Sequence, residues 1–237
     1  MKFLKHILLF ALLSLAGKLA YGQIPMLANY VDDKPIHFGF LIGYNQMLFD
    51  IKMKENDPNR EMVLAANSYY SPGFNVGIVS DLKLNRFVNI RLNPGLSFVE
   101  RSVEFHTKNP EYPLLGKSYI KKAEAVYLDV PLEFKLRSMR WKNFRPYIIA
   151  GGKYNFDFAS LKNVKPEDEE TFLRINPHDV QIVGGFGFDF YLQYFKFAIE
   201  LKMGFGTFDL LVEDNSVLTN SLDKMTARMF NFTLTFE

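Results

Sequence analysis

A histidine beside an aspartate, His178-Asp179, is the pairing in this chain that could act as an oriented general base. Such a base needs a nucleophile from another segment, and the spacing of the sequence identifies none. Apart from a histidine in the first residues, the other histidines are His37 and His106. We therefore expect no catalytic residue, no metal ligand and no cofactor-binding residue.

Two glycine-rich stretches look like phosphate-binding loops, namely Ala150-Gly151-Gly152-Lys153 and Gly184-Gly185-Phe186-Gly187. A phosphate loop opens a helix, whose first N–H groups face the anion. Both stretches lie instead within segments that alternate like strands, where glycine relieves crowding in a narrow barrel. The acidic run Pro166–Glu170 is interpreted as a solvated loop tip rather than a calcium site.

Charged residues that fall on one face of alternating segments are the larger group of chemical interest. Their signs are balanced, and a barrel of eight strands has an interior just wide enough for side chains. Because buried charges must be paired, they predict a structural cluster that fills the lumen rather than catalysis or a proton relay. The cluster consists of Arg91, Asp129, Glu133, Lys135, Asp189, Glu200 and Lys202.

The stretch Ala125–Arg137 shows the pattern that positions these charges. Apolar residues occupy every second position from Val126 to Leu136, and charged residues such as Asp129 and Glu133 lie between them. A period of two over this length predicts a strand with one apolar and one ionic face. A barrel wall in an outer membrane needs both faces, because one meets lipid and the other a polar interior.

About eight such segments can be marked, and no helical period competes with them over a comparable length. The predicted fold class is all-β, a transmembrane antiparallel β-barrel of about eight strands. Alternation in the fifth segment is too weak to assign its faces. The segments are about 36–51, 72–84, 88–98, 125–137, 144–158, 179–190, 196–206 and 226–237.

The connections alternate in length. Long ones are expected at about 52–71, 106–118, 159–177 and 209–225, and tight turns near 85–86, 138–143 and 193–195. Short periplasmic turns and longer outer loops are typical of outer-membrane barrels, and an even strand count places both termini in the periplasm. Aromatic residues gather around the short turns and predict an interfacial girdle of Trp141, Phe144, Tyr191, Tyr194, Phe195 and Phe236.

A lipocalin-like soluble barrel is the alternative, since it also alternates but keeps its apolar face inside. Charges such as Arg91, Glu133 and Lys202 would then face solvent in register on every strand, so the membrane barrel is favoured. Pro94 and Pro131 lie inside expected strands and each removes a ladder donor. A bulge or an edge-like seam there would accommodate them.

The start of the chain has the form of a secretory signal. Lys2 and Lys5 precede the short apolar run Ile7–Leu15, and Ala20-Tyr21-Gly22 supplies small residues before Gln23. We expect residues 1–22 to be a cleaved signal peptide rather than an uncleaved anchor, 23–35 a periplasmic segment and 36–237 the barrel. The chain has 237 residues, a net charge of +2 and no Cys, which indicates neither nucleic-acid binding nor a lipoprotein anchor.

Three stretches resemble the PorT family of small barrels in the type IX secretion and gliding motility machinery of Bacteroidota. They are His37-Phe38-Gly39-Phe40, Leu128–Lys135 and Arg145–Tyr154, and the resemblance extends over essentially the whole chain after the signal. It implies a bacterial outer-membrane protein required for export of proteins with a carboxy-terminal secretion signal. The implied partners are membrane lipid and other secretion proteins, with no nucleic acid and no small-molecule substrate. No catalytic residues are assigned in that family.

Three functions remain open from the sequence. The first is a non-enzymatic component of type IX protein secretion, and the second is a general small barrel with a structural or adhesive role. The third, a membrane enzyme acting on lipid or peptide, is disfavoured by the scarcity of histidine and the absence of a placed Ser-His or Asp-His site.

Overall fold

The computed structural model describes residues 34–54, 63–108, 117–158, 175–212 and 221–237. The predicted signal peptide lies outside these residues, as does the acidic run 166–170. No helix in the described ranges is long and apolar enough to span a bilayer. The structure consists of antiparallel strands: β1 Ile36–Met53, β2 Val63–Tyr69, β3 Ser71–Lys83, β4 Val88–Leu92, β5 Gly95–Thr107, β6 Lys117–Arg137, β7 Phe144–Asp157, β8 His178–Tyr191, β9 Lys196–Gly206 and β10 Leu222–Phe236.

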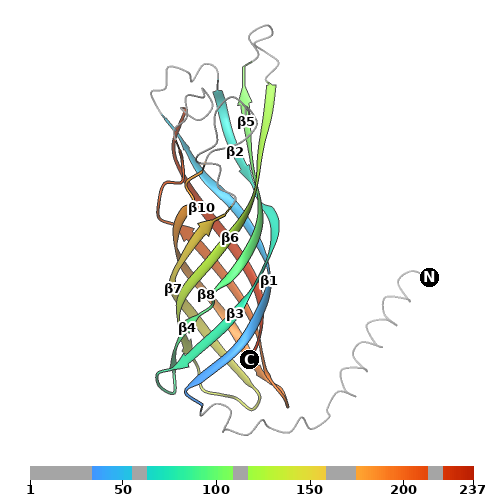
Figure 1. The fold of residues 1–237 in the computed structure, drawn as a ribbon, viewed down its shortest axis with the longest axis vertical. Helices are drawn as coiled ribbons and strands as arrows, with labels where there is room; N and C mark the ends of the chain where they lie inside the picture. The colour runs from blue at the N-terminus through green and yellow to red at the C-terminus, as the bar shows by residue number, and fades with distance from the viewer. Residues whose placement is uncertain (1–33, 55–62, 109–116, 159–174, 213–220) are drawn as a thin grey trace, which may run out of the picture.

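The sheet closes on itself, because β1 pairs with β10 on one side and with β3 on the other. Figure 1 shows the strands tilted around a tall barrel. β2 and β3 lie end to end and both pair with β5, while β4 and β5 lie end to end and both pair with β6. The ten strands therefore form the wall of an eight-stranded barrel, and the predicted fold class is confirmed.

The two interrupted strands differ in register. β4 and β5 keep one register against β6, so the break at Asn93-Pro94 is only a local loss of ladder bonds. Between β2 and β3 the register against β5 shifts by one residue next to Tyr70, which is a β-bulge. The sequence had predicted single strands and a loop at 52–71. The loop prediction was wrong for Val63–Tyr69, which form β2.

The strands reach further into the predicted long loops than the alternation indicated. β5 and β6 extend as a hairpin at the top of Figure 1. Packing explains the extension. Val63 on β2 and Phe105 on the neighbouring β5 are both fully buried in the apolar core of the barrel. The three tight turns at 84–87, 138–143 and 192–195 occur where they were predicted and form the short-turn rim.

The two faces of the wall have opposite character. Apolar side chains point outward, as with Leu132 (52% exposed) and Phe134 (48%), whereas the charged side chains of Glu133 and Lys135 next to them are buried in the lumen. β7, whose faces the sequence left open, turns Arg145, Tyr147 and Ile149 inward. Its alternation was weak because two of these three lumen residues are apolar.

Candidate functional site

Arg91 on β4 is the centre of a buried ion-pair network in the half of the lumen near the short-turn rim. Its guanidinium contacts Asp81 on β3 at 3.1 Å, Glu200 on β9, and the side chain of Glu237 beyond β10. All four side chains are fully buried. One planar cation with five donors satisfies three carboxylates from different strands, which is the geometry that tolerates buried charge.

Further ion pairs extend the network across the lumen. Lys135 on β6 contacts Asp189 on β8 at 2.8 Å, and Lys202 on β9 bridges Glu133 at 3.0 Å and Glu200 at 3.2 Å. A weaker pair joins Lys153 and Asp129 at 3.6 Å between nitrogen and oxygen. The structure thus places all seven cluster residues that the sequence singled out inside the barrel and in contact with an opposite charge: Arg91, Asp129, Glu133, Lys135, Asp189, Glu200 and Lys202.

Several members of the network were missed by the sequence prediction. They are Asp81, Lys196 and Glu237, which contribute charges, and Tyr147, whose hydroxyl donates to Glu200 at 2.7 Å. The ammonium of Lys135 also lies 3.8 Å from the centre of the Tyr147 ring. The signal was present for the three charged residues. Lys196 falls on the same alternating face as Glu200 and Lys202, and Asp81 and Glu237 alternate with the outward apolar residues of their own segments.

The other half of the lumen, near the long loops, has an apolar core. Its fully buried residues include Phe105 and Met225, and two segments outside the strands close it. Ile175 forms an isolated bridge with Leu211, and Leu210 donates its backbone N–H to Met225 at 2.9 Å. The prediction that the charged cluster fills the lumen was therefore wrong at this end, because the inward positions there carry apolar residues. One ion pair, Arg101–Asp157 at 2.9 Å, lies within the same half.

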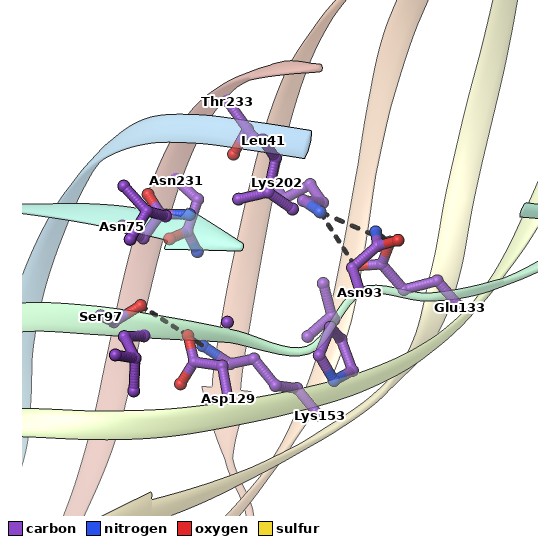
Figure 2. A pocket seen from close by; sticks show the side chains of 15 residues that line it. Leu41, Asn75, Asn93, Ser97, Asp129, Glu133, Lys153, Lys202, Asn231 and Thr233 are labelled. Atoms are coloured by element: carbon purple, nitrogen blue, oxygen red, sulfur yellow. Dashed lines mark hydrogen bonds and ion pairs between the residues drawn. The ribbon is translucent and has the colours of Figure 1, made fainter. Parts of the chain in front are cut away.

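A cavity of about 40 Å³ lies between lumen and wall beside the break in β4–β5 (Figure 2). The residues that line it include Asn93, Asp129, Glu133, Lys153, Lys202 and Thr233. Figure 2 shows Asn93 and Lys202 meeting at the Glu133 carboxylate, and Ser97 hydrogen-bonded to Asp129. The hydroxyl of Ser97 donates to the Asp129 carboxylate at 2.6 Å.

The remaining sequence motifs do not form a reaction centre in the described structure. His178 and Asp179 are neighbours in β8, so their side chains point to opposite faces of the wall. His178 Nδ1 shares a hydrogen bond with the Tyr154 hydroxyl at 2.6 Å on the outside, and Asp179 is buried inside. Both glycine-rich stretches lie within strands β7 and β8, as predicted, and neither opens a helix.

The predicted aromatic girdle has one wrong member. Trp141, Tyr194 and Phe195 are exposed at the short-turn rim, and Phe144 and Phe236 are partly exposed on the outer wall, where Phe236 stacks on Phe40 at 4.8 Å. Tyr191 is instead 1% exposed and lies inside the barrel. Its hydroxyl accepts a hydrogen bond from Arg145 at 3.3 Å, so its position in the strand, rather than its distance from the turn, decides its face.

Basic side chains accompany the aromatic residues at the short-turn rim. The three turns contain Arg86, Arg140 and Lys142 and no Asp or Glu. The guanidinium of Arg145 joins two of the turns by donating to the backbone oxygens of Ser138 at 2.8 Å and Arg86 at 3.4 Å. The rim is therefore a fixed surface of positive charge and exposed aromatic rings.

Lys142 has a backbone φ of 54° in this rim. That conformation costs an L-residue roughly 1–2 kcal/mol and is usually left to glycine. Strain of this kind persists where the surrounding structure holds it. Here the Nε of Arg140 donates to the backbone carbonyl of Lys142 at 2.7 Å and helps to fix the turn.

A sequence profile described as "Outer membrane protein beta-barrel domain" matches residues 23–212, most of the chain. The chain belongs to this family. The protein is accordingly an outer-membrane β-barrel of a bacterial cell, and its apolar outer face and closed sheet have the form that this location requires.

No curated protein matches this outer-membrane barrel in sequence. Among solved structures it is similar to the outer membrane protein OprG from Pseudomonas aeruginosa (14% identity, 84% of this chain and 93% of that chain covered, TM-score 0.43). It is also similar to Ail, the attachment invasion locus protein of Yersinia pestis (14%, 86% and 98%, TM-score 0.39). Neisserial surface protein A is a third (8%, 85% and 98%, TM-score 0.41). At these identities none of the three says what this barrel does.

Proposed function

We propose that this barrel is a non-enzymatic component of type IX secretion that acts by contact with other parts of the translocon. The observation that supports contact rather than conduction is the filled lumen. Ion pairs occupy one half and apolar side chains the other, so the described interior offers no path for a protein cargo. The secretion role itself rests on the resemblance of the sequence to PorT proteins.

We assign the contact surface to the short-turn rim. Its exposed basic side chains Arg86 and Lys142 lie among exposed aromatic rings such as Trp141, a combination suited to an acidic partner surface. Arg140 is half-buried, and its guanidinium lies 3.9 Å from the centre of the Tyr191 ring. The backbone strain at Lys142 supports the same assignment, because a glycine there would relieve it. The rim would face the periplasm, and the apolar wall above it would contact membrane lipid.

The first experiment separates this proposal from a general barrel role. A strain lacking the protein should fail to release proteins that carry the carboxy-terminal secretion signal, as measured by mass spectrometry of the medium. Complementation with the intact chain should restore release. Normal release in the deletion strain would overturn the secretion role.

The second experiment tests the rim. The variant Arg86→Gln/Arg140→Gln/Lys142→Gln should not restore release, although heat-modifiable migration shows that the barrel has assembled. The matched control is Lys52→Gln/Lys224→Gln, which removes exposed charges from paired strands at the opposite end and should restore release. Replacement of 159–177 by a short turn, and truncation of 23–34, test the long-loop side and the amino-terminal segment. Full release by the rim variant would overturn the assignment of the rim.

A specific observation favours a second function, adhesion at the cell surface. β2 runs from the long-loop end of the barrel to the bulge at Tyr70, and Leu64, Tyr69 and Tyr70 along it are exposed. The Tyr69 hydroxyl donates to Glu104 on β5 at 2.8 Å. Exposed tyrosines of this kind are frequent in binding surfaces. Intact secretion together with altered surface binding in the deletion strain would select this function.

A further inference from the structure

Two prolines remove backbone donors from the barrel wall beside the small cavity. The N–H of Asn93 donates to the carbonyl of Pro131 at 3.4 Å, and the N–H of Ile78 donates to the carbonyl of Pro94 at 2.9 Å. In an antiparallel ladder each of these pairs would exchange a second bond in return. Proline has no N–H, so Asn93 and Ile78 receive no ladder donor for their own carbonyls.

A third proline in the wall shows how the protein compensates elsewhere. The carbonyl of Pro146 accepts from Ser138 at 3.0 Å, and the return bond is again impossible. There the Nε of Arg145 donates to the Ser138 carbonyl at 2.8 Å and replaces the missing N–H. No described side chain does the same for Asn93. A buried carbonyl without a donor is costly, so a replacement must come from elsewhere.

The cavity beside Asn93 also has buried side-chain oxygens without a hydrogen-bond partner in the described structure. Among the described residues, Asn93 Oδ1, Asp129 Oδ1 and Thr233 Oγ1 are buried and unpartnered, and all three residues line this cavity. Gly77 and Gly95 pair across β3 and β5 on the lumen side and carry no side chain that could fill the space. The cavity of about 40 Å³ is enough for about three water molecules, at roughly 10–15 Å³ each.

We propose that this cavity is a binding site for two to three ordered water molecules, which supply the donors that Pro131 and the lining side chains lack. Water fits the site better than a metal cation does. The two carboxylates that line the cavity, Asp129 and Glu133, are already paired with Lys153 and Lys202, so a cation would meet no unpaired negative charge. Water can donate to the remaining oxygens and accept from the ammonium groups. The water cluster connects the part of the wall that contains Pro94 and Pro131 with the ion pairs of the lumen.

The first test uses the full-length protein refolded in lipid vesicles. Solid-state NMR with magnetisation transfer from water should give cross-peaks at Asn93, Asp129 and Thr233. Phe105 and Met225 in the apolar half serve as internal controls and should give none. Absence of water contacts at all three polar residues would overturn the proposal.

The second test restores the missing donor. In Pro131→Ala the new N–H can bond to the Asn93 carbonyl, and amide hydrogen exchange at Asn93 should slow by about three- to tenfold, the factor that corresponds to one net hydrogen bond. Its water cross-peak should weaken in parallel. The matched control is Pro146→Ala. It should leave exchange at Asn93 unchanged, because the missing donor at Pro146 concerns the Ser138 carbonyl, which Arg145 already satisfies. Unchanged exchange in Pro131→Ala, or an equal slowing in both variants, would overturn the proposal.

Discussion

The two halves of the lumen solve the same packing problem with opposite chemistry. Near the short-turn rim, charged side chains from several strands meet in pairs and triads centred on Arg91. Near the long loops, apolar residues such as Phe105 and Met225 pack as they would in a soluble protein. The wall around both halves is the same continuous antiparallel sheet.

The difference shows that the interior of a narrow barrel has only to be filled and satisfied, not to be polar throughout. In the charged half, each side chain is stable only while its partners remain, since an unpaired buried charge is expensive. In the apolar half, each side chain contributes mainly by volume and area. The two halves should therefore respond differently to truncation, which leads to four measurements.

The largest effect is expected for Arg91→Ala. This change leaves the carboxylates of Asp81, Glu200 and Glu237 buried without their common cation, and should lower the free energy of unfolding by about 3–5 kcal/mol. Urea unfolding in lipid vesicles measures it. Arg228→Ala is the control, because its pair with Asp50 is exposed and should contribute only about 0–1 kcal/mol. Equal losses in the two variants would contradict a central role for Arg91.

The apolar half is probed by Met225→Ala. Met225 is fully buried beneath the segments that close the long-loop end, so its truncation should cost about 2–4 kcal/mol through lost burial and a residual cavity. Met225→Leu, which nearly conserves volume, should cost less than about 1.5 kcal/mol in the same unfolding assay. A loss for Met225→Leu as large as for Met225→Ala would mean that volume does not govern this half.

Glu133→Ala tests a charge that has a shared partner. Lys202 loses one carboxylate but keeps Glu200 at 3.2 Å, so the expected cost is smaller than for Arg91, about 1–3 kcal/mol. The double variant Glu133→Ala/Lys202→Met should recover part of the lost stability, because the ammonium group that loses the Glu133 carboxylate is then also absent. If the double variant lost the full sum of the single losses, the two residues would not be coupled.

The smallest effect is expected when both members of a buried ion pair are replaced by apolar residues like those in the other half of the lumen. Lys135→Met/Asp189→Leu removes both members of an ion pair of 2.8 Å, and its stability should stay within about 1 kcal/mol of the original chain. Each single change should cost more than the double change. A double variant less stable than both singles would show that this pair stabilises beyond filling space.

The facing of the strands could be predicted from the sequence with few errors. Period-two alternation is a local property of the backbone, so inward and outward positions of β6 and β9 follow from the residues themselves. Tyr191 shows the limit of a rule based on distance from a turn, since it lies beside a turn yet points inward. The bulge at Tyr70 and the apolar half of the lumen were missed, because both depend on contacts between segments far apart in the chain.

The sequence by itself determined an all-β barrel, its lipid and lumen faces and the positions of its tight turns, because these follow from short-range periodicity and turn residues. Only the tertiary structure decided which charges meet. Arg91 and Glu200 are 109 residues apart in the chain and touch because closure of the tilted sheet brings β4 and β9 to the same level of the lumen. The cavity beside Asn93 has the same origin, since strand register places Pro94 and Pro131 in one seam of the wall.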